Sequence, residues 1–147
     1  MTTIHASAVL VGARAVLIRG AAGSGKSSLA LALIQAADSG ATLPFARLVG
    51  DDRVHVEAAY GRLLVRPHEA IAGLIEVRGL GLRRLPCERV ATVGLVVDLG
   101  EPAERLPERE SAIATLSGVT LPRLAVAPQT DPLRLVFAAL RTQDSSL

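Results

Sequence analysis

The sequence predicts an α/β domain in which a mixed β-sheet carries flanking helices, and three observations support this class. The chain has 147 residues, which is long enough for one domain and too short for two. Hydrophobic residues make up 50% of it but aromatic residues only 2%, so the core must consist of aliphatic side chains. Short apolar runs alternate with turn residues and helical segments. We therefore expect 1–147 to form a single domain, with a frayed tail at 143–147.

The first forty residues are expected to form a β-hairpin, a glycine-rich loop and a helix. The apolar runs 4–11 and 15–19 predict two strands joined by a turn at 12–14. Residues 26–37, KSSLALALIQAA, contain strong helix formers and no breaker, and a turn cluster follows at 38–40. The loop between 19 and 26 therefore joins a strand to a helix.

The rest of the chain alternates strands with turns and ends in a second helix. Further short strands are expected at 47–49, 54–58, 62–66 and 74–77. The longer apolar run 90–99 predicts a central strand, and 102–109 predicts a charged surface loop. A turn at 117–118 would join two short strands, and Asp131-Pro132 supplies the N-cap and first-turn proline of the last helix.

Charge and hydropathy exclude two classes of partner. The net charge is only +2 and the basic residues are scattered, so we expect no nucleic-acid-binding stripe. Arg14, Arg19 and Asp98 interrupt the longest apolar stretches before they reach the ~20 residues that a membrane span needs. The N-terminal segment also lacks the basic region of a signal peptide. The expectation is a cytoplasmic protein without membrane or nucleic-acid partners.

The strongest motif is GAAGSGKS at 20–27, which fits the phosphate-binding pattern G-x-x-x-x-G-K-[ST]. Backbone N–H groups of such a loop, with the positive end of the following helix, surround the phosphates of a nucleotide. Fifteen of the sixteen basic residues are Arg, and the single Lys is Lys26 in this loop. Ser27 would hold Mg²⁺. The alternative to a phosphate-binding loop is an ordinary glycine-rich turn. The candidate nucleotide-binding residues are Gly20, Ala21, Ala22, Gly23, Ser24, Gly25, Lys26 and Ser27.

Two adjacent carboxylates, Asp51 and Asp52 in LVGDDR, follow a short apolar strand. At the end of a strand they can face one cleft, where one helps to hold Mg²⁺ and the other accepts a proton from an incoming hydroxyl. A solvated Asp-Asp turn is the alternative, and it would be preferred for an isolated pair without a preceding phosphate-binding loop. The pattern leaves open which aspartate is the base, with a slight preference for Asp52.

Glu76 and Arg78 in GLIEVRGLG are two residues apart in an expected strand and therefore lie on the same face. A carboxylate beside a guanidinium suits metal binding and stabilisation of phosphate charge, but a cross-strand salt bridge would also explain the pair. His5 is a weaker candidate, since a lone histidine in a strand is more often packed or hydrogen-bonded than catalytic.

The segments HASAV, GAAGSGKS, LVGDDRV and IEVRGLG together strongly resemble the C-terminal catalytic domain of bifunctional HPr kinase/phosphorylase. AERLPE and GVTLPRLAV extend the resemblance over nearly the whole chain. It implies a P-loop-containing fold of the HPr kinase/PEP carboxykinase type. It also implies an enzyme that uses ATP, or in some members pyrophosphate, with Mg²⁺ to phosphorylate a serine of HPr, the phosphocarrier of the phosphotransferase system. Such enzymes can also remove that phosphate by phosphorolysis.

Carried over residue by residue, the resemblance places catalytic candidates at His5, Lys26, Asp51, Asp52, Arg78 and Arg105. It makes Ser27 and Glu76 the Mg²⁺ ligands. One member of the aspartate pair would accept the proton of the incoming serine and would donate it in the reverse reaction. The family is hexameric and its substrate contacts include the C-terminal helix, so the resemblance implies a homo-oligomer.

The chain departs from the family in four places, of which Glu104, where many members have Asp, is the mildest. His5 lies almost at its start, so the usual N-terminal regulatory domain is expected to be missing. Lys26 and Asp51 are 51 − 26 = 25 positions apart, more than the family leads us to expect, which suggests an inserted loop at 38–46. APQTDP at 127–132 lacks the arginine of the Pro-Gly-Arg loop associated with dephosphorylation. We therefore predict a kinase whose phosphorylase activity is weak or absent.

Two other functions are compatible with the motifs. A P-loop kinase for a small molecule would need a closing lid, for which 102–109 is the candidate. A regulator that binds ATP and an HPr-like partner without transferring phosphate would need the glycine-rich loop only. The protein kinase is preferred because the chain also has Asp51, Asp52, Glu76 and Arg78.

Overall fold

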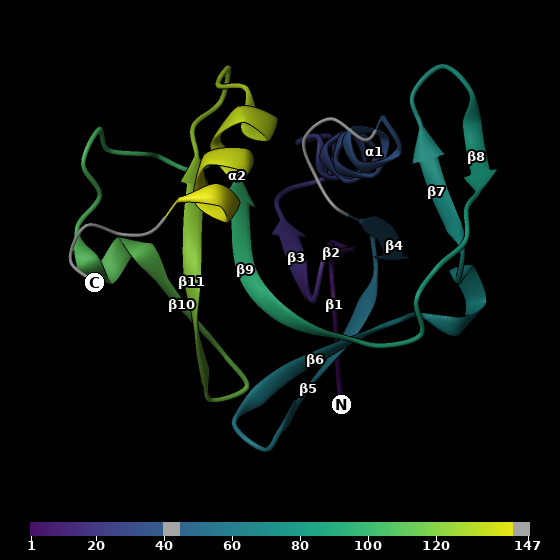
Figure 1. Cartoon of the computed structure of the whole chain (residues 1–147), viewed down its shortest axis with the longest axis horizontal. Helices are drawn as coiled ribbons and strands as arrows, with labels where there is room; N and C mark the ends of the chain where they lie inside the picture. The colour runs from purple at the N-terminus through teal and green to yellow at the C-terminus, as the bar shows by residue number, and fades with distance from the viewer. Residues whose placement is uncertain (40–44, 143–147) are drawn as a thin grey trace.

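The computed structural model describes residues 1–39 and 45–142 and shows a mixed α/β fold with a curled mixed sheet (Figure 1). The sheet has the strand order β1-β5-β6-β9-β3-β2-β4, and β11 joins it by pairing with β9. Its strands are β1 (Thr2–Ile4), β2 (Ala6–Val11), β3 (Arg14–Arg19), β4 (Ala46–Gly50), β5 (Val54–Ala59), β6 (Arg62–Pro67), β9 (Ala91–Leu99), β10 (Ile113–Leu116) and β11 (Val119–Val126). The other elements are α1 (Lys26–Asp38), α2 (Pro132–Arg141), the short 3₁₀ helices η1 (Glu69–Ile71) and η2 (Arg109–Ala112), and a separate hairpin of β7 (Leu74–Val77) and β8 (Gly81–Arg84).

The long apolar run near residue 95 forms β9, which is a central strand as predicted. β9 pairs in parallel with β3 on one side. On its other side it pairs with β6 near its start and in parallel with β11 near its end. A strand enclosed on both faces has no solvent-facing positions, which explains its nearly continuous apolar sequence.

Two hydrophobic cores lie on opposite faces of the sheet. Ile18 of β3 belongs to the core that also contains Leu29 and Leu33 of α1, whereas its neighbour Leu17 belongs to the core within the curl of the sheet. Both β3 side chains are 0% exposed, because successive side chains of a strand point to opposite faces. Burial of each such side chain contributes roughly 1.5–3 kcal/mol. β3 is therefore held firmly where it delivers the chain into the glycine-rich loop.

Both helices were predicted, and both are confirmed. α1 follows Gly25, whose φ of 102° lies in the left-handed region that favours glycine. α2 begins after Asp131, whose side chain accepts a hydrogen bond from Leu133 N at 3.1 Å, and has proline in its first turn. Among the described residues, no helix is long and apolar enough to cross a bilayer.

Three local expectations are corrected by the structure. The expected strand 4–11 is divided at His5, because β1 pairs with β5 whereas β2 pairs with β3 and β4. Residues 81–84 form β8, which was not predicted because all four are exposed and show no polar-apolar alternation. Arg78 lies just beyond β7, in the turn of that hairpin. The expected frayed tail at 143–147 and residues 40–44 of the expected inserted loop lie outside the described residues.

Candidate active site

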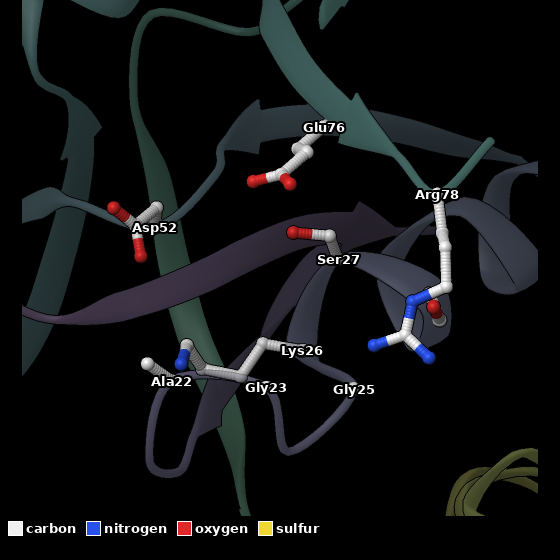
Figure 2. Close-up of a pocket in the computed structure, with 9 residues that line it drawn as sticks. Ala22, Gly23, Gly25, Lys26, Ser27, Asp52, Glu76 and Arg78 are labelled. Atoms are coloured by element: carbon white, nitrogen blue, oxygen red, sulfur yellow. The ribbon is translucent and has the colours of Figure 1, made fainter. Parts of the chain in front are cut away.

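An open cavity of about 170 Å³ lies where the glycine-rich loop, the start of α1, the β4–β5 turn and the β7–β8 hairpin meet. Figure 2 shows Asp52 and Arg78 on opposite sides of Ser27, with Glu76 between them along the rim. The fold thus gathers residues that are up to 78 − 22 = 56 positions apart in sequence. The lining consists of Ala22, Gly23, Gly25, Lys26, Ser27, Ser28, Asp52, Glu76 and Arg78.

The glycine-rich loop closes around the ammonium group of Lys26. Its Nζ donates to the carbonyls of Gly20 at 2.8 Å and Ala21 at 3.1 Å, and the residue is only 7% exposed. An ammonium group has three donors, so a third N–H is available to the cavity that Lys26 lines. The loop is tight, because a Cβ at Gly20 would collide with Ser24 Oγ. Free N–H groups at the start of α1 add positive potential to this corner.

Asp51 lies beneath the cavity and does not line it. The residue is 5% exposed, and its two carboxylate oxygens are surrounded by protein donors. Ser7 Oγ donates to Oδ1 at 2.6 Å, and Glu76 N donates to Oδ2 at 3.1 Å. Ser27 Oγ lies 2.8 Å from both oxygens. The carboxylate therefore connects α1 with β2 and β7.

Asp52 is exposed and faces the cavity. Its φ of 67° is a left-handed conformation, which aspartate tolerates better than most residues with a side chain. Its backbone is anchored, since Asp52 N donates to Ser7 Oγ at 3.2 Å and its carbonyl accepts from Ala6 N at 3.1 Å. Within the described part of the chain its carboxylate has no ion-pair partner. The two aspartates are thus separated, one as a buried anchor and one as a free carboxylate.

The cavity combines oxygen ligands with positive charge. Because Ser27 donates its only proton to Asp51, the lone pairs of Ser27 Oγ are directed away from that carboxylate. The Ser27 hydroxyl with the carboxylate of Glu76 fits Mg²⁺, which uses few protein ligands and completes its octahedron with water and phosphate. Among residues 1–39 and 45–142, there is no group of three or more His, Cys, Asp or Glu side chains that could hold a metal ion without other ligands.

The alternative explanation of Glu76 and Arg78 as a salt bridge receives no support. The ion pairs of the described residues are Arg19–Asp98, Arg47–Glu88 and Arg123–Asp98. Glu76 and Arg78 both line the cavity and are both exposed. Their charges are therefore accessible to a ligand.

Besides Asp51, two more of the expected catalytic residues, His5 and Arg105, do not line the cavity. His5 is exposed in the bend between β1 and β2, one residue before Ala6, which binds the carbonyl of Asp52. Arg105 lies in the exposed segment 101–108 that leads into η2. Three residues of the loop also lie outside the lining: Gly20, Ala21 and Ser24. The carbonyls of Gly20 and Ala21 nevertheless accept hydrogen bonds from Lys26.

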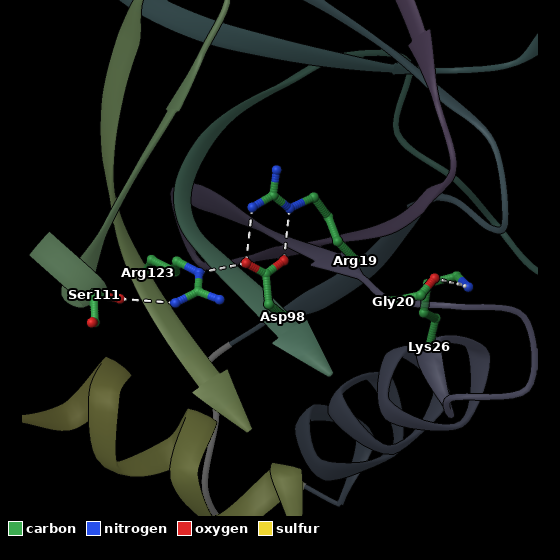
Figure 3. Close-up of polar contacts among 6 residues, drawn as sticks. All are labelled: Arg19, Gly20, Lys26, Asp98, Ser111 and Arg123. Carbon is green, nitrogen blue, oxygen red and sulfur yellow. Dashed lines mark hydrogen bonds and ion pairs between the residues drawn. The ribbon is translucent and has the colours of Figure 1, made fainter. Parts of the chain in front are cut away.

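A buried ion network beside the loop was not predicted from the sequence. Asp98 at the end of β9 is 7% exposed and accepts from Arg19 Nε at 2.7 Å, from Arg19 Nη2 at 2.8 Å and from Arg123 Nε (Figure 3). Burial by itself would raise the pKa of Asp98, but the hydrogen bonds from Arg19 and Arg123 lower it below its ordinary value. Arg123 also donates to the carbonyl of Ser111 at 3.0 Å. The sequence signal was a carboxylate near the end of an apolar strand, with nothing to identify its partners.

The comparisons with known proteins identify one family. The model of the HPr Serine kinase C-terminal domain matches residues 1–86. The HPr kinase/phosphorylase of Clostridium beijerinckii is 38% identical over 81 residues, which are 55% of this chain and 24% of that protein. The HPr kinase/phosphorylase of Clostridium tetani is 32% identical over 105 residues, which are 67% of this chain and 32% of that protein. The chain spans about a quarter to a third of the length of these curated relatives.

A solved structure extends the similarity to the rest of the fold. The HPr(Ser) kinase/phosphatase from Coxiella burnetii matches 96% of this chain and 95% of its own chain, with a TM-score of 0.76 and 25% sequence identity. The family match covers more than half of the chain and includes the loop, both aspartates and the β7–β8 hairpin. The chain therefore belongs to the HPr Serine kinase C-terminal domain family.

Proposed function

We propose that this chain is the catalytic domain of a protein-serine kinase that phosphorylates an HPr-type phosphocarrier, with ATP as donor and Mg²⁺ as cofactor. The supporting observation is the cavity in which Lys26, Ser27, Asp52, Glu76 and Arg78 meet. The relatives named HPr kinase/phosphorylase support a protein acceptor. In this proposal 1–147 is one P-loop domain that acts in the cytoplasm as a homo-oligomer and regulates the phosphotransferase system.

At the nucleotide side of the cavity, residues 20–27 would bind the phosphates. The first residues of α1, with their free N–H groups and the third donor of Lys26, line this region and suit negative charge. Ser27 and Glu76 would hold Mg²⁺, which neutralises charge on the transferred phosphoryl group when bound. Asp51 keeps the Ser27 hydroxyl oriented by accepting its proton.

At the acceptor side, Asp52 is the better proton acceptor of the pair. Its carboxylate faces the cavity, whereas both oxygens of Asp51 are already hydrogen-bonded to Ser7, Ser27 and Glu76. A positioned general base contributes about 10²–10⁴-fold to such a transfer. Arg78 would stabilise charge on the phosphoryl group. Roles for His5 and Arg105 are proposed from the family resemblance alone, since neither lines the cavity.

The test is an assay with the purified protein, Mg²⁺, ATP and the HPr-type carrier of the same organism. Intact and fragment mass spectrometry should detect one phosphoserine on the carrier, and Lys26→Ala should abolish it. Arg62→Ala, an exposed position at the start of β6 outside the cavity lining, is the control and should leave the product unchanged. ATP binding without phosphate on the carrier would contradict the proposal. It would favour an ATP-responsive regulator or a small-molecule kinase.

A further inference from the structure

We propose that Ser7 is a positioning residue that sets the geometry of Asp51 and Asp52; its catalytic consequence rests on the function proposed above. Ser7 lies in β2 and is 0% exposed. A hydroxyl buried among aliphatic side chains is unfavourable unless it forms hydrogen bonds. Ser7 finds its partners in the turn that carries the two aspartates.

One hydroxyl group contacts both aspartates. Ser7 Oγ donates to Asp51 Oδ1 at 2.6 Å and accepts from Asp52 N at 3.2 Å. A hydroxyl has a single proton. Because that proton is donated in the hydrogen bond to Asp51, the oxygen of Ser7 must accept the hydrogen bond from Asp52 N with a lone pair. Ser7 therefore couples the carboxylate of the buried aspartate to the backbone of the aspartate that faces the cavity.

The turn that bears Asp52 depends on such support. A residue other than glycine keeps a φ near 67° only when its surroundings stabilise that conformation. The pairing of β2 with β4 also shifts here, since Ala8 faces Gly50 but Val9 faces Leu48. This irregularity redirects the end of β4, so that Asp51 points inward beside Ser7 and Asp52 turns outward.

The position of Ser7 predicts an effect on the transfer step and little effect on ATP binding. Ser7 does not line the cavity, and within the described residues the hydrogen bonds of its hydroxyl go to Asp51 and Asp52 rather than to the glycine-rich loop. Without its hydroxyl, Asp51 Oδ1 would retain only the contact with Ser27, and Asp52 N would lose its acceptor. The proposed base would then be less well placed, while Asp51 would still accept from Ser27 and so hold the phosphate-binding end of the cavity.

Three variants test this role. Ser7→Ala should lower kcat for carrier phosphorylation about 10–100-fold, as expected for loss of a hydrogen bond to a charged group, with little change in the KM for ATP. Ser7→Thr keeps the hydroxyl and suits a strand, so it should recover most of the kcat. Val9→Ala is the matched control, since Val9 is 0% exposed in the same strand but belongs to the core beneath α1. It should lower the Tm without a comparable loss of kcat.

Several results would overturn the inference. One is a kcat of Ser7→Ala within about threefold of the wild-type kcat, because the loss of one hydrogen bond to a charged group predicts a larger fall. Another is an equal loss of kcat in Ser7→Ala and Val9→Ala at equal loss of stability, because general destabilisation would then explain both. Failure of Ser7→Thr to recover activity while it remains folded would also argue against a role for the hydroxyl.

Amide hydrogen exchange of Asp52, followed by NMR, tests the contact without any kinase assay. The Asp52 amide should be protected in the wild type and should exchange at least about tenfold faster in Ser7→Ala. If this holds but the wild type transfers no phosphate, Ser7 positions the pair and only the proposed reaction is wrong. An Asp52 amide that is unprotected in the wild type would overturn the inference about Ser7.

Discussion

The side-chain hydroxyl of Ser27 lies 2.8 Å from both carboxylate oxygens of Asp51. This contact joins the first turn of α1 to the end of β4. The same carboxylate accepts from Glu76 N in β7, so one buried group holds three elements around the cavity. The shape of the cavity therefore depends on Asp51, although Asp52 is the member of the pair that lines it.

Asp52→Asn should separate binding from catalysis. Asparagine tolerates the left-handed backbone at this position and preserves the backbone contacts with Ser7 and Ala6. We expect kcat for carrier phosphorylation to fall about 10²–10⁴-fold, with nearly unchanged affinity for ATP and carrier. Steady-state kinetics and calorimetric titration measure the two effects. Retention of more than a tenth of the wild-type kcat would exclude Asp52 as the base.

Asp51→Ala should destabilise the fold by about 2–4 kcal/mol, because it leaves the Ser7 hydroxyl and the Glu76 N–H without their buried acceptor. Urea unfolding measures the free energy of unfolding. Glu88→Ala is the control, since it removes a partly exposed ion pair with Arg47 and should change the stability by less than about 1 kcal/mol. Similar losses in the two variants would show that the buried contacts of Asp51 contribute little.

Lys26→Arg keeps the positive charge but should not preserve ATP binding. Lys26 Nζ is held between the carbonyls of Gly20 and Ala21 in a nearly buried position, which a planar guanidinium does not fit. We expect the affinity for ATP with Mg²⁺ to fall about 10–100-fold, as in Lys26→Ala. Calorimetric titration measures this, with Arg134→Lys on the exposed face of α2 as the matched control. Binding as tight as that of the wild type would show that the loop does not enclose the cation.

The Asp98 network should make stability depend on pH in the acid range. Burial opposes ionisation, but the hydrogen bonds from Arg19 and Arg123 hold the folded-state pKa of Asp98 below its ordinary value of 3.8. When the pKa is lower in the folded state than in the unfolded state, the ionised group stabilises the fold at pH values above the unfolded-state pKa. This contribution is lost as the pH falls through the folded-state pKa. The difference in unfolding free energy between wild type and Asp98→Asn should therefore be largest near neutral pH and shrink below about pH 4. A difference that stays constant from pH 7 to pH 3 would contradict the ionised network.

The phosphorylase reaction should be weak in this protein. The segment 127–132 contains no arginine, and in the structure it forms the approach to α2, with Asp131 as its N-cap. We expect release of phosphate from the phosphorylated carrier to be much slower than its phosphorylation. Incubation of the protein with the serine-phosphorylated carrier and inorganic phosphate, followed by mass spectrometry, measures the rate of the reverse reaction. Efficient phosphate-dependent release would refute this prediction.

Most regular elements could be predicted because their signals are local. The helix formers after Lys26, the N-cap at Asp131 and the apolar run of β9 each act within a few residues, and α1, α2 and β9 form where expected. The break at His5 could not be predicted, because it arises from the pairing of β1 with β5. β8 was missed for a similar reason, since its exposed residues form a strand only by pairing with β7.

For the candidate site, the sequence alone determined which chemical groups are available: a glycine-rich loop with the only lysine, a hydroxyl, two adjacent aspartates and the Glu76–Arg78 pair. Only the tertiary structure decided that Asp51 is buried and Asp52 faces the cavity. It also decided that Ser7 contacts both aspartates and that Asp98 pairs with Arg19 and Arg123. Two aspartates side by side have the same local signal. Their roles differ because strands distant in sequence supply hydrogen-bond donors to one and leave the other open to solvent.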